Sequence, residues 1–348
     1  MRSTLVRRIK DMVRRWFPFV MPIWECYRNR QRSVEAKKLY LNDYNAMVRH
    51  SIAFDSPCRE AALAHIIMNY HVIEKGLTMP NRHLWFGQSA VLELMQTLTD
   101  FERRFGVNDI EFRHGVGVVK SYMEMHAAAV TGEKDAERMS FWARIMAFCD
   151  SHFEIPPSRQ FHFSREEFYR DNLSPFDKFA RSRHTCRHFV EGATIPDEEI
   201  KAAVSLAQTS PSACNRQHVR VHCVSDPALK ERVRALQGGN RGFGHLADKF
   251  LVVTSDISDL YWAIERYDLY TNAGIFVMNL CYALHFHKIA HCILHCSMKP
   301  DRDRELRNAL SIPESERFVC MIACGKAPDE FDVAASKRKP VETILSMH

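Results

Sequence analysis

The spacing of hydrophobic residues changes partway along this 348-residue chain. In the first half, apolar residues recur three and four positions apart, which is the period of an amphipathic α-helix. The clearest of these runs cover residues 58–76, 89–105, 118–130 and 137–153. Strand-like alternation is hard to find before residue 215. The first half is therefore predicted to be almost entirely helical.

The second half mixes helices with short β-rich runs. Pro196 and the three acidic residues after it predict a helix start, because proline fits the first turn and carboxylates favour the positive helix end. Strands are expected at 219–224, 250–254 and 318–324, and a long helix at 259–286. We therefore predict an α+β fold with a helix-covered sheet in residues 166–348, after a mainly helical region in residues 1–165.

Composition places the chain among ordinary globular proteins. Its 46% hydrophobic and 26% charged residues exclude a disordered protein, and the absence of a fixed-period repeat argues against solenoids and propellers. The eleven cysteines are odd in number and scattered, which suits reduced thiols in a cytosolic protein rather than a disulfide framework. The apolar stretch at 16–24 is too short to span a membrane. A cytoplasmic location is expected.

The first 32 residues are strongly basic. They contain nine Lys and Arg residues against Asp11 and Glu25. A solvated helix face or a partly disordered terminus is the favoured interpretation. Weak contact with a membrane surface remains open, because aromatic residues at 16–24 flank the basic ones. No nucleic-acid partner is predicted.

Three clusters in the second half suit ligand binding. In an extended segment, Arg183, Thr185 and Arg187 would project to one side, where two guanidiniums and a hydroxyl suit a phosphate. Residues 210–217 fall between a helix end and a strand start, where backbone donors and short polar side chains can meet a ligand. A basic tail at 336–340 could fold back to complete an anion site. The alternatives are a basic exposed strand, an ordinary turn and a solvated tail.

The order and spacing of these clusters resemble the nitroreductase family. That family typically has R-x-S/T-x-R/K, then P-S-x-x-N-x-Q before a strand, and a late Arg-x-Pro. This chain supplies, in the same order, Arg183-x-Thr185-x-Arg187, Pro211-Ser212-x-x-Asn215-x-Gln217 and Arg338-x-Pro340. The resemblance covers about residues 180–345. Three motifs in the same order and register are more specific than any one of them alone.

The resemblance implies an obligate homodimer with FMN bound at the subunit interface. NAD(P)H would reduce the flavin and a small organic acceptor would reoxidise it, in a ping-pong cycle. The chemistry then belongs to the flavin, so no catalytic side chain and no resident metal are predicted. A further implied property is a role in polysaccharide or other specialised biosynthesis, because residues 70–87 resemble the leader of nitroreductase-like proteins found beside polysaccharide-biosynthesis enzymes.

The same resemblance assigns cofactor-binding residues. Arg183, Thr185 and Arg187 would hold the flavin phosphate and ribityl chain, with His184 in the same segment and Arg338 at the phosphate. The isoalloxazine edge would be lined by Pro211, Ser212, Ala213, Asn215 and Gln217. Asn240 and Arg241 lie in a glycine-rich segment that the family brings to the flavin pyrimidine.

Two other interpretations stay open. Histidines and cysteines crowd residues 285–296, where pairs such as His291 with His295 share a face and could bind zinc, although buried structural use is favoured. The second interpretation is a non-catalytic flavin-binding partner protein. In the helical half, His71, Glu74 and Lys75 are candidate site residues, but a helix charge pair explains them more simply.

Overall fold

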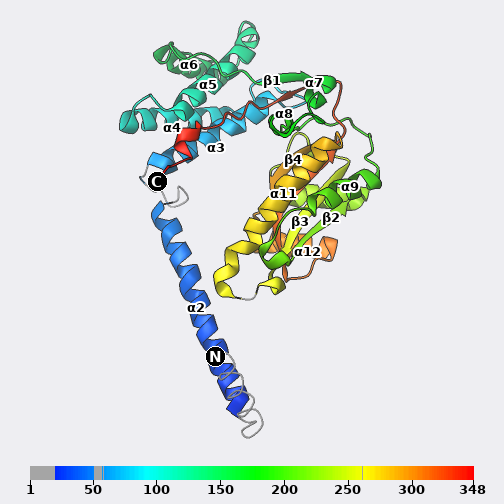
Figure 1. Cartoon of the computed structure of the whole chain (residues 1–348). Helices are drawn as coiled ribbons and strands as arrows, with labels where there is room; N and C mark the ends of the chain where they lie inside the picture. The colour runs from blue at the N-terminus through cyan, green and yellow to red at the C-terminus, as the bar shows by residue number, and fades with distance from the viewer. Residues whose placement is uncertain (1–19, 51–56, 58, 261) are drawn as a thin grey trace. The chain divides into compact units, whose positions relative to one another are not determined.

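The computed structural model describes residues 20–50, 57, 59–260 and 262–348. The chain divides into two compact units (Figure 1). One contains helix α2 (Val20–His50) and the 3₁₀ turn η5 (Ala263–Tyr267), joined by an ion pair between Arg266 and Asp43 at 2.8 Å. The other unit covers Pro57–Asp259 and Asp268–His348. No described helix is long and apolar enough to cross a bilayer. Most of the basic N-terminal stretch lies outside the described residues.

Four helices form the first part of the larger unit, as the sequence predicts. They are α3 (Arg59–Leu77), α4 (Gln88–Phe105), α5 (Ile110–Val130) and α6 (Ala136–Ser151). Their apolar stripes meet in one core, in which Ile66, Leu98 and Tyr122 are fully buried. Asp135 begins α6 by accepting hydrogen bonds from the backbone amides of residues 137 and 138. Helix α3 continues one residue past Gly76, where the predicted helical run at 58–76 ends.

A small two-stranded ribbon follows the helices. Strand β1 (Phe161–Ser164) pairs antiparallel with β6 (Glu330–Val333), near the end of the chain. Two short helices, α7 (Arg165–Tyr169) and α8 (Phe176–Ser182), lead from β1 to the sheet region. The expectation that strands are absent before residue 215 is therefore wrong at β1, because its four residues are too few to show alternation and they pair only with a distant segment.

The main sheet has four antiparallel strands in the order β2-β3-β5-β4. The strands are β2 (Val219–Val224), β3 (Lys249–Asp256), β4 (Ala290–His295) and β5 (Glu316–Gly325). The sheet region also contains four helices, which are α9 (Asp197–Ala207), α10 (Pro227–Leu236), α11 (Asp268–Phe286) and α12 (Pro300–Leu310). The short turns are η2 (Ala213–Asn215), η3 (Gly244–Leu246), η4 (Ile257–Asp259) and η6 (Val341–Thr343).

Both faces of this sheet are covered. Alternate residues of β3 enter different cores, as the two-residue period of a strand requires. Phe250 and Val252 join a core with residues of α10 and α12, whereas Leu251 and Val253 join a core with residues of α9 and α11. Figure 1 shows α9 and α11 lying across the sheet. The α+β prediction of a helix-covered sheet preceded by helices is confirmed.

The long helix before β4 is shorter than predicted. The sequence suggests a helix from residue 259, but α11 begins at Asp268. Residues 263–267 form the separate turn η5, whose Arg266 is held by Asp43 of α2 rather than by a continuing helix. The predicted apolar face of the helix, including Ala273, Leu280 and Leu284, is buried as expected.

Candidate functional site

The predicted phosphate-binding segment runs in extended conformation after α8. Its middle is fixed to the sheet edge, because the backbone amide of Cys186 donates to the carbonyl of His291 in β4 at 3.0 Å. Cys186 is fully buried, while Thr185 and Arg187 are half-buried. Burial raises the pKa of the Cys186 thiol to about 12, so this side chain is a neutral anchor. The flanking polar side chains keep access to solvent.

Arg183 lies beside neutral histidines and has no carboxylate partner among the described residues. Burial is the main cause that lowers the pKa of His285 to about 3 and that of His291 to about 4, and the nearby Arg183 charge contributes to both lowerings. His285 is also hydrogen-bonded to the Ser182 hydroxyl at 2.8 Å. A guanidinium surrounded by uncharged groups leaves a positive charge that an anion can neutralise.

Arg338 reaches the same neighbourhood from the C-terminal segment. Burial lowers the pKa of His184, and the charges of Arg183 and Arg338 both add to this lowering. Arg338 also lines a small hollow beside Tyr70 and Glu111 of the helical part. Arg183 and Arg338, which are far apart in sequence, therefore both lie close enough to His184 for their charges to act on it.

The second predicted segment, residues 210–217, lies around a different hollow of about 240 Å³. That hollow is lined by Gln208, Ser210, Pro211, Ser212, Gln217, Val219, Arg220, Asn272 and Phe276. The backbone of residues 210–217 is unusual, because three non-glycine residues have positive φ angles. These are Cys214, Asn215 and Gln217, with φ angles of 52°, 54° and 51°. Ser212 supports the turn by accepting a hydrogen bond from the Gln217 amide at 3.1 Å. Such left-handed conformations in non-glycine residues store strain and are typical of functional loops.

The glycine-rich loop at 238–244 contains two residues that are predicted to bind the flavin, Asn240 and Arg241, and their environments differ. Asn240 is buried, and its amide nitrogen donates to the carbonyls of Gln237 at 2.6 Å and Arg234 at 2.8 Å. The Asn240 side chain thus shapes the loop. Arg241 is exposed. Gly242, with a φ of 86°, passes so close to Met79 that an added Cβ would lie 3.1 Å from its sulfur.

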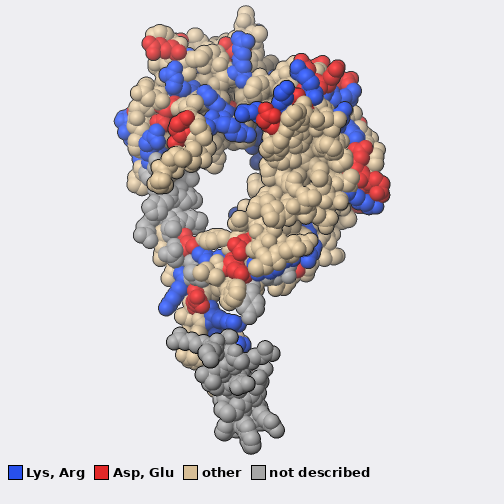
Figure 2. Space-filling model, viewed as in Figure 1, with Lys and Arg blue, Asp and Glu red and all other residues tan. Residues whose placement is uncertain are grey.

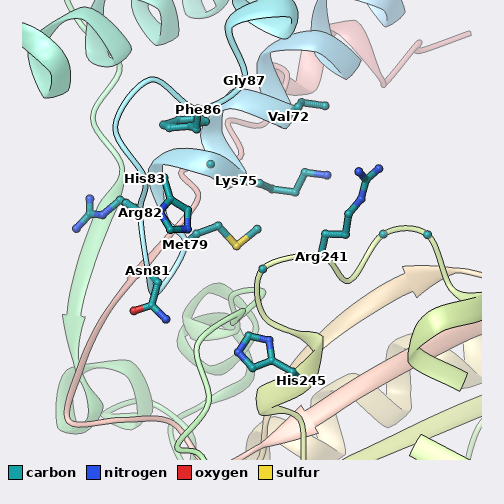
Figure 3. A pocket seen from close by; sticks show the side chains of 14 residues that line it. Val72, Lys75, Met79, Asn81, Arg82, His83, Phe86, Gly87, Arg241 and His245 are labelled. Carbon is teal, nitrogen blue, oxygen red and sulfur yellow. The ribbon is translucent and has the colours of Figure 1, made fainter. Parts of the chain in front are cut away.

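A larger hollow of about 860 Å³ opens between this loop and the end of α3 (Figure 3). It is lined by Val72, Lys75, Gly76, Met79, Asn81, Arg82, His83, Phe86, Gly87, Gly238, Gly239, Arg241, Gly242 and His245. Lys75 and Arg241 extend toward each other across it. Burial lowers the pKa of Lys75, and the nearby charge of Arg187 lowers it further. Figure 2 shows Lys and Arg side chains gathered around α3.

Sequence reasoning missed several residues of this hollow. Met79, Asn81, His83 and His245 carry no motif of their own. The resemblance of residues 70–87 to a leader region is a signal that could have found Met79, Asn81 and His83, but it does not extend to His245. His71 and Glu74 form the i, i+3 pair that the sequence suggests, at 3.0 Å, but Glu74 is fully buried and also pairs with His114 at 2.8 Å.

The histidine and cysteine cluster at 285–296 is largely a core feature. Cys292 and Cys296 are buried in the core that packs against α10 and α12. His291 donates from Nδ1 to the Ile289 carbonyl at 3.0 Å. Within the described part of the chain, no three His, Cys, Asp or Glu side chains converge as metal ligands.

Comparison with known proteins identifies one matching family. Residues 180–240 match the family model described as the nitroreductase family. This segment contains the extended arginine segment, the 210–217 turn and β2. No curated protein matches the chain.

Several solved structures are similar to about half of the chain. A candidate NAD(P)H:FMN oxidoreductase from Staphylococcus epidermidis is 17% identical, over 50% of this chain and 96% of that one, with a TM-score of 0.44. A candidate nitroreductase from Desulfovibrio desulfuricans, solved with FMN, is 21% identical over 50% and 97%, with a TM-score of 0.43. A nitroreductase family protein from Streptococcus pneumoniae is 19% identical over 50% and 100%, with a TM-score of 0.42.

Proposed function

We propose that this protein is an FMN-dependent oxidoreductase that passes electrons from NAD(P)H to a small organic acceptor. The observation that carries the proposal is the pair Arg183 and Arg187. Both lie on a fixed extended segment inside the family-matched residues 180–240, and neither has a carboxylate partner among the residues described. Planar guanidinium groups that have no carboxylate partner are suited to binding a phosphate monoester such as that of FMN.

The residues present fit the flavin. Arg183, Thr185 and Arg187 would hold the phosphate and ribityl chain, and Arg338 would add a charge from the C-terminal segment. Arg241 and the glycines beside it would approach the ring from the large hollow, where the absence of side chains lets the backbone come close. When bound, FMN supplies hydride chemistry at its ring, so the protein needs no nucleophile of its own.

The turn at 210–217 would act on the flavin of a second copy. Pro211, Ser212 and Gln217 line the 240 Å³ hollow and are absent from the lining of the 860 Å³ hollow beside Arg241. A homodimer resolves this separation by giving each flavin the arginine segment of one chain and the turn, with Ala213 and Asn215, of its partner. Helix α11 exposes Tyr270, Ile275 and Met278, which such a dimer could cover.

The cycle proposed is ping-pong. NAD(P)H and the acceptor would enter the same hollow in turn, which the chain keeps open with a volume large enough for a ring above the flavin. A role in polysaccharide or other specialised biosynthesis, and a cytoplasmic location, are proposed with it on the basis of residues 70–87 and the scattered reduced thiols.

The test is to purify the chain, record its absorbance, and identify any chromophore released by heating. We expect FMN, and we expect Arg183→Ala to weaken FMN binding by at least about tenfold, because a charge-assisted hydrogen bond contributes roughly 1.5–3 kcal/mol. Arg181→Ala is the matched control, since Arg181 is an exposed arginine at the end of the preceding helix.

A wild-type protein that neither contains nor takes up FMN would contradict the proposal, and metal analysis would then test the cluster at 285–296. Tightly held FMN that neither NADH nor NADPH reduces would favour the non-catalytic flavin-binding alternative.

A further inference from the structure

The helical part of the chain forms one wall of the large hollow in Figure 3. This wall is held rigidly by the helical core. The Phe86 ring lies against Gly76, where an added Cβ would come within 2.0 Å of it. The Phe86 carbonyl accepts a hydrogen bond from the buried Tyr122 hydroxyl at 2.8 Å. Lys75, one residue before Gly76, is therefore presented from a fixed backbone.

The charges on the two walls are unbalanced. The lining contains Lys75, Arg82 and Arg241 but no Asp or Glu. Arg82 is neutralised outside the hollow by Asp332, at 3.1 Å. For the other two cations, the described chain offers no ion-pair partner. Two cations on opposite walls, one of them half-buried, are an arrangement that an anionic ligand stabilises.

The neighbour of Lys75 makes the imbalance larger. The Arg187 guanidinium lies close enough to disfavour the charged form of Lys75, in addition to the effect of burial. If the FMN phosphate neutralises Arg183 and Arg187, Lys75 and Arg241 still face open space across the hollow. A second anionic group that enters the hollow would then meet two cations without an ion-pair partner among the described residues.

We propose that Lys75, acting across the hollow from Arg241, makes the enzyme select an electron acceptor that carries an anionic group, a carboxylate or a phosphate. Lys75 is thus a specificity-determining residue that the helical part contributes to the flavin site. This inference rests on the proposed flavin-dependent function. It also gives the helical part a direct task, since the wall it builds decides which acceptor is held over the ring.

The test compares two acceptors of nearly equal size, 4-nitrobenzoate and 4-nitrobenzamide. Their dissociation constants are measured by calorimetry on the FMN-saturated full chain without reductant, so the readout does not depend on turnover. Wild type is expected to bind the anion more tightly than the amide. Lys75→Gln is expected to reduce this preference by about tenfold to a hundredfold, the range of a hydrogen bond to a charged group. Lys75→Arg should keep most of it.

Lys134→Gln is the matched control, because Lys134 is an exposed lysine of the same helical part outside the hollow. Its preference should equal that of wild type. In a second arm, NADPH-driven reduction of each compound to the nitroso product uses one hydride and one proton and releases water. Lys75→Gln should lower the ratio of the two kcat/KM values by a similar factor.

Three outcomes would overturn the inference. The first is an equal affinity of flavin-loaded wild type for both compounds. The second is loss of FMN in Lys75→Gln, which would assign Lys75 to the flavin phosphate. The third is an effect of Lys75→Gln on NADPH binding alone, which would assign it to the nucleotide phosphates. A wild-type chain that binds no FMN would overturn the proposed function as well, so the two failures are distinguishable.

Discussion

Glu74 is a fully buried carboxylate held by two histidines. Its oxygens accept hydrogen bonds from His71 at 3.0 Å and His114 at 2.8 Å, and His114 in turn contacts the Ser158 hydroxyl at 3.1 Å. Burial alone would raise the pKa of Glu74, but the hydrogen bonds from His114 and His71 outweigh it and lower the pKa to about 2. This network ties α3 to α5 behind the wall that carries Lys75.

The first prediction concerns stability and its pH dependence. Because the folded pKa of Glu74 is lowered, its contribution is fully present above its ordinary pKa and is lost as pH falls toward 2. Glu74→Gln should lower the free energy of unfolding by about 1–3 kcal/mol at pH 7. It should also flatten the loss of stability between pH 4.5 and pH 2. Urea unfolding at several pH values measures both.

Glu93→Gln is the control, because Glu93 pairs with His65 at 3.4 Å on the exposed surface of α4. An exposed pair of this kind contributes about 0–1 kcal/mol. Equal effects of the two substitutions would show that the buried network adds nothing to stability.

At the scale of elements, α5 depends on a glycine for its closest contact. An added Cβ on Gly117 would lie 2.3 Å from the Ser158 hydroxyl oxygen and 2.9 Å from the Pro156 carbonyl. The Ser158 amide donates to the Gly117 carbonyl at 3.0 Å, and the Ser121 hydroxyl donates to the Ser158 carbonyl at 2.8 Å. The segment leading from α6 to β1 is therefore fixed directly against the α5 backbone.

Gly117→Ala should accordingly lower the free energy of unfolding by about 1–3 kcal/mol, through overpacking against a backbone carbonyl that cannot move aside easily. Gly132→Ala is the control at the end of the same helix, where an added Cβ meets nothing within 4 Å. Chemical denaturation of both variants checks this. A Gly117→Ala protein as stable as Gly132→Ala would contradict the close approach.

Elements with local signals were predictable from the sequence. The predicted limits of β2 are those of the structure, and α9 begins directly after Pro196 as its acidic first turn suggests. The β1–β6 ribbon was not predictable, because its residues His162 and Asp332 are 170 positions apart and each strand is too short for a period. The separate turn η5 was not predictable either, because its Arg266 pairs with Asp43, 223 positions away, which no local pattern near residue 266 indicates.

The candidate site divides in the same way. The arginine segment, the 210–217 turn and Arg241 follow from motifs along the chain, because each motif is contiguous. The placement of Lys75 opposite Arg241 does not follow from any motif, because this placement depends on how the helical part packs against the glycine-rich loop. The burial of Asn240 was also hidden, since a loop asparagine looks the same whether it faces a ligand or its own backbone.

At the scale of the whole molecule, the two separated hollows predict shared sites. Differently tagged Arg183→Ala and Asn215→Gly chains should each bind FMN poorly as homodimers. Glycine is chosen because residue 215 has a positive φ, which glycine tolerates. The isolated heterodimer should hold about half the wild-type FMN, because one of its two sites then combines two intact halves.

A chain carrying both substitutions, paired with wild type, is the control and should hold little FMN, since each site then has one defect. The reverse pattern, with flavin in the control and none in the test heterodimer, would place both segments in one chain's site. Flavin absorbance per protein measures each case.

The position of β5 has a consequence for how the chain is made. It lies inside the sheet between β3 and β4, yet it is the last of the four strands in the sequence. While a ribosome is still producing residue 315, β3 has only β2 beside it and β4 has no neighbour. The core of α3–α6 is complete by Ile155 and can form much earlier. The apolar strands β3 and β4 therefore lack their shared neighbour β5 during this part of synthesis, and we expect chaperones to be most needed in that interval.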